Sequence, residues 1–553
     1  MPADLLIRNA RVLTMDGSAP RAEAVAITGN LITAVGRDSD VAAYRGPRTT
    51  IIDAGGKTLL PGFIESHLHI FMGGATLTRL SLDGLKGFDA MASAIRAWAA
   101  THPDEPLIFA MHTSYQILGD PIDRHALDRI LPDRPLAVYA YDGHTVWANT
   151  RALEVAGLLH GRALRPGNEI VMGRDGRATG ELREPEAFAP LFALLPTGGR
   201  EALGYTTGRD PDPVPSPADR VTDRATIKRG LDYCASLGIT SIHNMDGNSY
   251  QLGLLEELDD AGALACRVQL PYHQKNDKTI ADLVEGAPAM RARNRPDRIT
   301  TNFVKVFVDG VLDSTTALML DDYAGKPGWK GDALFTQEAL SEVAIAADRL
   351  GFQIAIHSIG DGGVRRSLNA FEAARRANGA RDSRHRVEHI EVIDPADIPR
   401  FRELGVIASM QPLHAPGPLS YDGTSLMGLL GEARQPFAFA WNTLRAAGAR
   451  LCFASDWPVS PLDPLRSICA AVTRERFAPS HPDQAQTLMQ ALEGYTIDGA
   501  YAEFAEDRKG RVTPGFLADL VLLDTDIEAV APADIVSIKA AMTICDGRIT
   551  HGG

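Results

Sequence analysis

Hydrophobic and polar positions alternate with period two through the first sixty residues. The apolar stretches 5–15, 24–36 and 50–56 are separated by turn dipeptides such as Asp-Gly and Gly-Asn, a pattern that predicts short antiparallel strands. The stretches 510–524 and 540–552 at the other end of the chain repeat it. Because an unpaired sheet edge is a liability, we expect both chain ends to complete one β-sandwich domain.

Between these ends, short apolar runs alternate with helical stretches rich in Ala, Leu, Arg and Glu. The runs are 59–69, 239–245, 266–272, 303–310, 352–358, 385–390, 406–412 and 450–456. Eight βα repeats are typical of a closed parallel barrel of about 250 residues. The sequence therefore predicts an α/β fold built on a (β/α)8 TIM-type barrel.

A large insert follows the first of these runs. The second run begins far too late in the chain for the gap to be a bare loop, and the stretches 107–113 and 136–144 within it read as further strands. We expect a β-sandwich made of 1–58 and 505–553, a barrel made of 59–74 and 226–504, and an inserted lobe at 75–225.

Composition and charge restrict the partners. The chain has 553 residues, 45% of them hydrophobic, and a net charge of −14, which disfavours nucleic acid as a partner. Nowhere do 18 consecutive apolar residues occur, so no membrane span is expected. The chain has five cysteines, an odd number, and no two of them form a Cys-x-x-Cys pair. This favours a reducing compartment, and we expect a cytoplasmic protein.

Metal-binding residue types end several of the expected barrel strands. His67 and His69 lie two residues apart in PGFIESHLH, so both side chains can leave the strand on one face and chelate a cation. That pair alone fits two ordinary strand-end histidines equally well. The further candidates are Lys305, His357, His389 and Asp456. Their alternatives are a surface lysine, satisfied core histidines and a helix cap.

Lys305 has unusual surroundings for a lysine, since it lies between Val304 and Val306 within VKVFVDG. Burial among apolar neighbours lowers the pKa of an amine and makes it nucleophilic. In that state it can capture carbon dioxide as a carbamate, whose two anionic oxygens can bridge two cations. Arg386, beside His389, reads instead as a salt-bridged residue on the barrel exterior.

These motifs occur together in a known family. PGFIESHLH, VKVFVDG, AIHSIGDGG, RVEHIE, SMQP and ASDWPVSPLDPL resemble the amidohydrolase superfamily, and more narrowly its amidohydrolase-3 branch of N-substituted formamide deformylase-like metal-dependent hydrolases. The resemblance covers essentially the whole chain. Glu65 stands where many members carry Asp, next to the ligands without being one.

The resemblance implies a site with one or two divalent ions, zinc being expected. His67 and His69 would bind the first metal, together with Asp456. His357 and His389 would bind the second, and N6-carboxylated Lys305 would bridge the two.

The implied reaction is hydrolysis of a linear carbon–nitrogen bond in an amide or formamide-like small molecule. Metal-bound hydroxide would attack the carbonyl, and Asp456 would act as the proton shuttle. The alternatives are a deaminase or cyclic-amide hydrolase on the same metal site, or a catalytically silent binding or regulatory homologue. Self-association as a homo-oligomer, such as a dimer, is a further expectation from the resemblance.

Substrate contacts are expected from residues near the barrel mouth. The candidates for stabilising the oxyanion of the transition state are His144, His243, Gln411 and His414. Tyr115 in the insert is expected to line the pocket, because loops on that face carry specificity.

Overall fold

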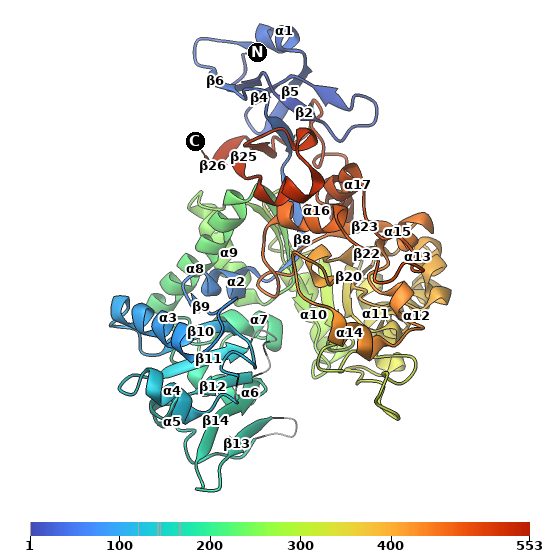
Figure 1. Cartoon of the computed structure of the whole chain (residues 1–553). Helices are drawn as coiled ribbons and strands as arrows, with labels where there is room; N and C mark the ends of the chain where they lie inside the picture. Colours follow the sequence, from blue (N-terminus) through green and yellow to red (C-terminus); the bar gives the residue numbers. More distant parts are fainter. Residues whose placement is uncertain (1, 120, 141–142, 144, 165–167, 553) are drawn as a thin grey trace. The chain divides into compact units, whose positions relative to one another are not determined.

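The structure, a computed structural model, describes residues 2–119, 121–140, 143, 145–164 and 168–552. The chain divides into two compact units (Figure 1). Unit 1 holds Met1–Ile70, Gly204–Asp210 and Lys228–Gly553, and unit 2 holds Phe71–Leu203 and Pro211–Ile227. Helices alternate with parallel strands through much of unit 1, so the expected mixed α/β class is confirmed.

Strands from both chain ends pair within unit 1. Strand β7 (Thr58–Pro61) runs antiparallel to β24 (Leu520–Leu523) in a sheet of order β26-β25-β24-β7-β2-β3, and a second sheet has the order β5-β4-β1-β6. The other strands are β1 (Leu5–Arg8), β2 (Arg11–Leu13), β3 (Arg21–Ala22), β4 (Ala24–Thr28), β5 (Leu31–Gly36), β6 (Thr50–Asp53), β25 (Ala540–Cys545) and β26 (Arg548–His551). Residues of both sheets, such as Ile7 and Leu520, share one buried apolar cluster.

The sequence pattern predicts purely antiparallel pairing at the chain ends, whereas the observed pairing is mixed. Strand β1 pairs parallel with β6, and β2 pairs parallel with β7. Alternation of apolar and polar positions does not distinguish the two directions. Parallel pairing requires a long connection, which the intervening strands supply in both cases.

The middle of unit 1 is built from parallel strands in two sheets, of order β18-β16-β15-β8 and β17-β19-β20-β21-β22-β23. These strands are β8 (Phe63–Leu68), β15 (Ile239–Asn244), β16 (Arg267–Gln269), β17 (Tyr272–His273), β18 (Ile299–Thr300), β19 (Phe303–Phe307), β20 (Gln353–Ser358), β21 (Arg386–His389), β22 (Ile407–Met410) and β23 (Arg450–Phe453). Each of the eight apolar runs contains one complete strand of this set, and the run 266–272 also reaches the start of β17. After β23, Trp457 forms a parallel bridge with Leu68 at the end of β8.

The helices that alternate with these strands are α8 (Pro217–Ser236), α9 (Ser249–Asp260), α10 (Ile280–Arg291), α11 (Gln337–Arg349), α12 (Asp361–Asn378), α13 (Ile398–Leu404), α14 (Thr424–Leu430), α15 (Trp441–Ala446), α16 (Pro464–Val472), α17 (Leu488–Gly494) and α18 (Ile497–Ala502). Several begin at residues with a capping side chain. Thr279 and Thr336, for example, accept hydrogen bonds from backbone N–H groups in the first turns of α10 and α11, which would otherwise lack partners.

Unit 2 contains a sheet of order β13-β14-β12-β11-β10-β9. Its strands are β9 (Leu80–Ser81), β10 (Ile108–Thr113), β11 (Leu136–Ala140), β12 (Thr145–Ala148), β13 (Glu169–Met172) and β14 (Ala178–Arg183). Its helices include α3 (Phe88–Thr101), α4 (Arg124–Ile130), α5 (Thr150–Val155) and α6 (Pro185–Phe192). Phe109 and Ile108 belong to different apolar clusters, because successive strand residues face opposite sides of the sheet.

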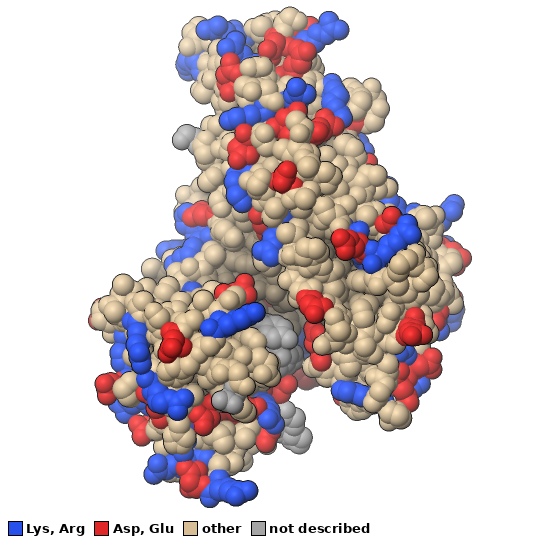
Figure 2. Space-filling model, viewed as in Figure 1, with Lys and Arg blue, Asp and Glu red and all other residues tan. Residues whose placement is uncertain are grey.

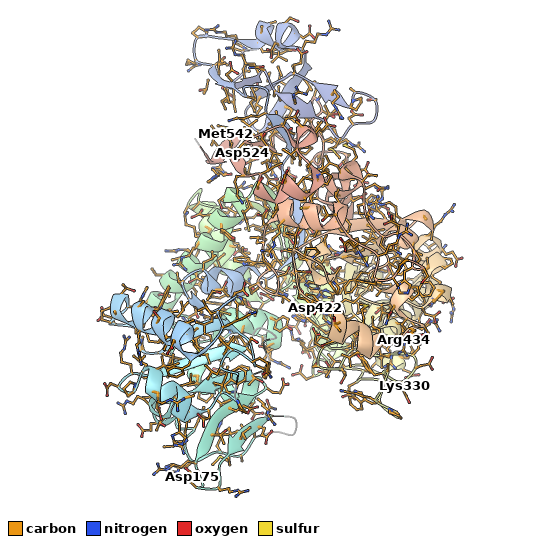
Figure 3. The ribbon with its side chains drawn as sticks, viewed as in Figure 1. Asp175, Lys330, Asp422, Arg434, Asp524 and Met542 are labelled. Carbon is orange, nitrogen blue, oxygen red and sulfur yellow. The ribbon has the colours of Figure 1, made fainter. Side chains whose placement is uncertain are left out.

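Asp175, labelled in Figure 3, lies in the turn between β13 and β14. It accepts a 2.5 Å hydrogen bond from Arg124, which ties this turn to α4. On the face shown in Figure 2, acidic and basic side chains are interspersed rather than gathered in one basic patch. Among the described residues, no helix combines the length and apolar character needed to cross a bilayer.

Candidate metal centre

Parallel pairing brings the predicted ligands of unit 1 to one edge. Phe307 at the end of β19 lies beside His357 of β20, and Ser358 lies beside His389 of β21. The segment after β23 reaches the same edge, where the backbone N–H of Asp456 donates to the carbonyl of His67 at 2.8 Å. The carboxyl ends of parallel strands meet at a common edge, so distant positions in the sequence become neighbours here.

Asp456 is the residue on which the histidines converge. Its Oδ1 lies 3.1 Å from Nε2 of His69 and 3.3 Å from Nε2 of His67. Its Oδ2 lies 3.7 Å from Nε2 of His414 and 3.9 Å from Nδ1 of His389. One ligand atom each from His67, His389 and Asp456 lies within 4.8 Å of the others. A single cation could therefore contact all three.

Each of three imidazoles is oriented by a hydrogen bond at its Nδ1 atom. The pairs are His67 with Oε2 of Glu388 at 2.7 Å, His69 with Oδ1 of Asp246 at 2.6 Å, and His389 with Oε1 of Gln411 at 2.9 Å. Donation from Nδ1–H leaves Nε2 with a lone pair. Histidines that bind metals almost always have their other ring nitrogen held in this way.

The charged groups around Asp456 stabilise a positive charge at this site. Burial lowers the pKa of His69, but the carboxylates of Asp246 and Asp456 outweigh burial and raise it to about 9. Burial also raises the pKa of Asp456, yet His67 and His69 hold it well below its usual range. A bound cation would supply the positive charge that a proton on His69 supplies otherwise.

Lys305 lies fully buried beside this group. Its Nζ has no hydrogen-bond partner among the described residues, and it lies 4.7 Å from the centroid of the Phe307 ring. Burial lowers the pKa of Lys305 to about 8, which increases the share of neutral amine at neutral pH. The surface-lysine alternative is therefore wrong, and burial shifts Lys305 toward the neutral amine that carbamate formation requires.

His357 completes the cluster. Its ring centroid lies 4.4 Å from that of His389, and its Nε2 donates to the carbonyl of Gly310 at 3.1 Å, which leaves Nδ1 as the available nitrogen. Burial and then the charge of Lys305 lower the pKa of His357 to about 3. The ring is therefore neutral at neutral pH, as a metal ligand must be.

These donors fit a divalent cation. In the part of the chain that the structure describes, Nζ of Lys305 and Nε2 of His389 are buried polar atoms without hydrogen-bond partners, and leaving such atoms unsatisfied is costly. His389 and Asp456 also have positive φ angles of 77° and 63°. Backbone strain of this kind in non-glycine residues gathers at functional sites.

Comparison with known proteins agrees with this geometry. A model of the Amidohydrolase family, Amidohydro_3, matches residues 50–551. The chain belongs to the amidohydrolase family. This confirms the resemblance inferred from the motifs, and the amidohydrolase is an enzyme of the metal-dependent hydrolase class that acts on carbon–nitrogen bonds.

Individual relatives are distant but extend over nearly the whole length. The amidohydrolase is 28% identical to Protein LONG AFTER FAR-RED 3 of Arabidopsis thaliana, over 95% of this chain and 88% of that protein. It is 26% identical to N-substituted formamide deformylase of Arthrobacter pascens, over 99% of this chain and 98% of that protein. An uncharacterized metal-dependent hydrolase from Pyrococcus horikoshii OT3 shares the fold, with a TM-score of 0.74 and 24% sequence identity. The match covers 96% of this chain and 99% of that protein.

Two of the predicted substrate residues lie at the candidate metal centre. Gln411 accepts the hydrogen bond from His389 already described, while its Nε2 has no partner within the described residues. The ring of His414 stacks on that of His389 with centroids 5.8 Å apart, and its Nδ1 donates to Glu391 at 3.2 Å. Both residues are therefore placed to contact a ligand near Asp456.

The other predicted substrate residues are placed differently. His243 is fully buried, with Nδ1 2.8 Å from Nη1 of Arg386 and Nε2 3.7 Å from Glu503. Tyr115 belongs to unit 2, where its hydroxyl donates to Thr145 at 2.7 Å. His144 lies outside the described residues. Substrate contact by these three residues stays a prediction.

A buried charged pair behind the ligands was missed by sequence reasoning. Arg386 has no exposed surface, so its interpretation as an exterior residue is wrong. Its Nε donates to Glu388 at 2.8 Å, and Glu388 in turn accepts from His67. The available signal was the spacing: positions 386 and 388 face the same side of a short strand, and an Arg-x-Glu pair can be buried when its charges are matched.

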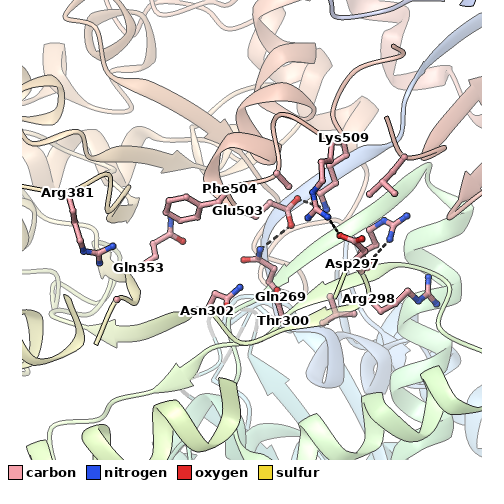
Figure 4. A pocket seen from close by; sticks show the side chains of 16 residues that line it. Gln269, Asp297, Arg298, Thr300, Asn302, Gln353, Arg381, Glu503, Phe504 and Lys509 are labelled. Atoms are coloured by element: carbon pink, nitrogen blue, oxygen red, sulfur yellow. Dashed lines mark hydrogen bonds and ion pairs between the residues drawn. The ribbon is translucent and has the colours of Figure 1, made fainter. Parts of the chain in front are cut away.

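A cavity of about 330 Å³ in unit 1 lies at the opposite ends of the strands (Figure 4). Residues at strand starts line it, among them Arg267 of β16 and Gln353 of β20. Lys509 pairs with Glu503 there at 2.6 Å, and Arg267 pairs with Asp519 at 2.7 Å. Because these lining charges are already neutralised and the ligands lie at the other edge, this cavity is not the candidate active site.

Proposed function

We propose that the protein hydrolyses a linear carbon–nitrogen bond in a small amide or formamide-like substrate. The observation that carries this proposal is the convergence of His67, His69, His389 and His414 on the carboxylate of Asp456. N-substituted formamide deformylase, which matches nearly the full chain, supports an acyclic amide as the substrate class. In this proposal the metal ligands are His67, His69, Lys305, His357, His389 and Asp456.

Within this chain, Asp456 would move the proton. Its carboxylate would take a proton from the attacking water and deliver it to the nitrogen of the leaving group, which cannot depart as an amide anion. His414 and Gln411 would donate hydrogen bonds to the oxyanion of the transition state. A bound divalent ion would supply a lowered pKa for water and polarisation of the carbonyl.

The proton transfer is tested with Asp456→Asn. The variant loses the basic oxygen, so kcat for a formamide substrate should fall by about 10²- to 10⁴-fold. Metal content measured by mass spectrometry should show that the variant retains much of its metal. Asp422→Asn, at an exposed carboxylate, is the matched control. An unchanged kcat in Asp456→Asn would remove the assigned role.

Substrate panels separate the proposal from its alternatives. Release of formate or another acid together with an amine from acyclic amides supports it. Release of ammonia from aminated heterocycles, or ring opening of cyclic amides, would assign the site to a deaminase or a cyclic-amide hydrolase. No hydrolysis after reconstitution with zinc or manganese would favour a silent binding or regulatory homologue.

Further parts of the proposal concern the assembly. We propose that the two parallel sheets form one closed (β/α)8 barrel at 59–74 and 226–504, with an inserted lobe at 75–225. Segments 1–58 and 505–553 would form a β-sandwich. The metal would be zinc, Lys305 would be N6-carboxylated, and the enzyme would be a cytoplasmic homo-oligomer, a dimer being the simplest case. Intact-mass and metal analysis test the site, and light scattering tests the assembly.

A further inference from the structure

Lys275 lies beside the metal centre, although nothing in the sequence pattern singled it out. Strand β17 pairs parallel with β19, with Tyr272 opposite Val304 and His273 opposite Lys305. Two residues further along, Lys275 and Phe307 occupy corresponding positions. Nζ of Lys275 lies 4.5 Å from the centroid of the Phe307 ring and 5.5 Å from that of Tyr205.

The two rings connect Lys275 to the predicted ligands. The ring of Phe307 also has Nζ of Lys305 at 4.7 Å and stacks on His357 at 4.7 Å between centroids. Tyr205 packs edge-on against His69, with centroids 5.1 Å apart. The ring of Phe307 therefore lies between Lys275 and the predicted ligands Lys305 and His357. The ring of Tyr205 lies between Lys275 and His69.

This ammonium has no anionic partner. Among the described residues, Nζ of Lys275 makes no hydrogen bond and no ion pair, and it lies over two aromatic ring faces. The nearby Lys278 differs, because its Nζ donates to the carbonyls of Gly208 and His273 at 2.7 and 2.8 Å. The amine of Lys275 thus has its hydrogen-bonding capacity unused.

Neither neighbouring carboxylate is paired with Lys275, although Oδ2 of Asp246 has no hydrogen-bond partner among the described residues. Asp246 accepts from His69 at 2.6 Å, and Asp277 pairs with Arg209 at 3.2 Å. Burial and then the charge of Lys305 lower the pKa of Lys275 to about 7, which shows how little its charge is compensated. Ring faces attract a cation only weakly, so an incoming anion would gain a desolvated partner.

We infer that Lys275 binds a carboxylate carried by the substrate. This inference rests on the proposed function and narrows its substrate class to acyclic amides that bear a carboxylate, such as N-acyl or N-formyl amino acids. A single ammonium neutralises a single negative charge. The scissile amide would lie over Asp456, and the carboxylate would lie against Lys275, flanked by Tyr205 and Phe307.

The test compares an N-formyl amino acid with its carboxamide, which differ in one charge, by the release of formate. Lys275→Met should raise KM for the carboxylate substrate by about 10- to 100-fold, the usual loss for a charged hydrogen bond. KM for the carboxamide and kcat for both substrates should change by less than about threefold. Lys275→Arg should recover part of the lost affinity. Lys278→Met, which removes a charge three residues away, is the matched control, and melting curves confirm that the variants are folded.

The outcomes separate the two proposals. Formate release by the wild-type protein with no preference for the carboxylate substrate, or with the same KM in Lys275→Met, overturns the inference and keeps the hydrolase. Absence of formate release from both substrates overturns the proposed function. Calorimetry with the zinc-loaded protein and the N-formyl amino acid then decides on Lys275: binding that is lost in Lys275→Met supports the carboxylate site, and no binding to the wild type overturns it.

Discussion

At the scale of single residues, sequence reasoning predicted the candidate donors that the fold brings together, but not the groups that orient them. His67 and His69 could be recognised because two residues of a strand at this spacing face one side. Their partners, Glu388 on β21 and Asp246 just after β15, lie 321 and 177 positions away. No local pattern contains that information. Lys275 was missed for the same reason, since strand pairing brings Phe307 to it and a short distant helix brings Tyr205.

Glu388→Gln tests whether the orienting hydrogen bond contributes to metal binding. The amide lacks the charge that polarises the imidazole of His67, so zinc affinity should fall by about 10- to 100-fold. Competition with a chromophoric chelator measures it without recourse to activity. Asp246→Asn should lower the affinity in the same direction through His69. Exposed Glu372 provides the control Glu372→Gln, and equal affinity of Glu388→Gln and wild type would show that the contact is structural alone.

At the scale of elements, the apolar runs predicted where the strands lie but not where their pairing changes. The run 266–272 is divided between β16, which pairs with β15 and β18, and β17, which pairs with β19. Pro271 lies between the two strands. Because proline has no backbone N–H to donate, the ladder cannot continue through it. Burial of these short strands on both faces also removes the alternation that would reveal their boundaries.

A buried carboxylate joins α11 to the segment that precedes β21. Asp348 accepts from Arg381 at 2.6 Å and from Asn378 at 2.8 Å, and it lies 3.3 Å from Nε2 of His385. Burial raises the pKa of Asp348, but His385, Asn378 and Arg381 outweigh burial and lower it to about 2. The depressed pKa stabilises the fold above the unfolded-state pKa of about 4, and this contribution is lost as the pH falls toward 2.

Asp348→Asn should therefore lower the free energy of unfolding by about 2 kcal/mol at pH 6. The difference from wild type should narrow progressively below about pH 4. Urea unfolding curves between pH 3 and pH 7 measure this difference. Asp382→Asn, at an exposed carboxylate in the same segment, should show no comparable pH dependence. A gap between Asp348→Asn and wild type that stays constant down to pH 3 would contradict the electrostatic explanation.

At the scale of the whole molecule, an internal ion pair connects the parallel strands of unit 1 to strands from the chain end. Arg267 at the start of β16 donates to Asp519, just before β24, at 2.7 and 3.0 Å, and both residues are 4% exposed. The sequence pattern indicated that the chain ends would associate, because their edges need partners. It could not indicate this contact, which spans 252 positions.

Arg267→Met should destabilise unit 1 by about 3–5 kcal/mol, because it leaves the carboxylate of Asp519 buried without its counterion. The double variant Arg267→Met/Asp519→Leu should recover part of that loss, since it removes the uncompensated charge while the backbone N–H of Asp546 loses its acceptor. Urea midpoints of the four proteins in the cycle give the coupling energy. Additive losses would mean that the pair contributes through packing alone. Other contacts between the sheets would then hold the chain end to the parallel strands of unit 1.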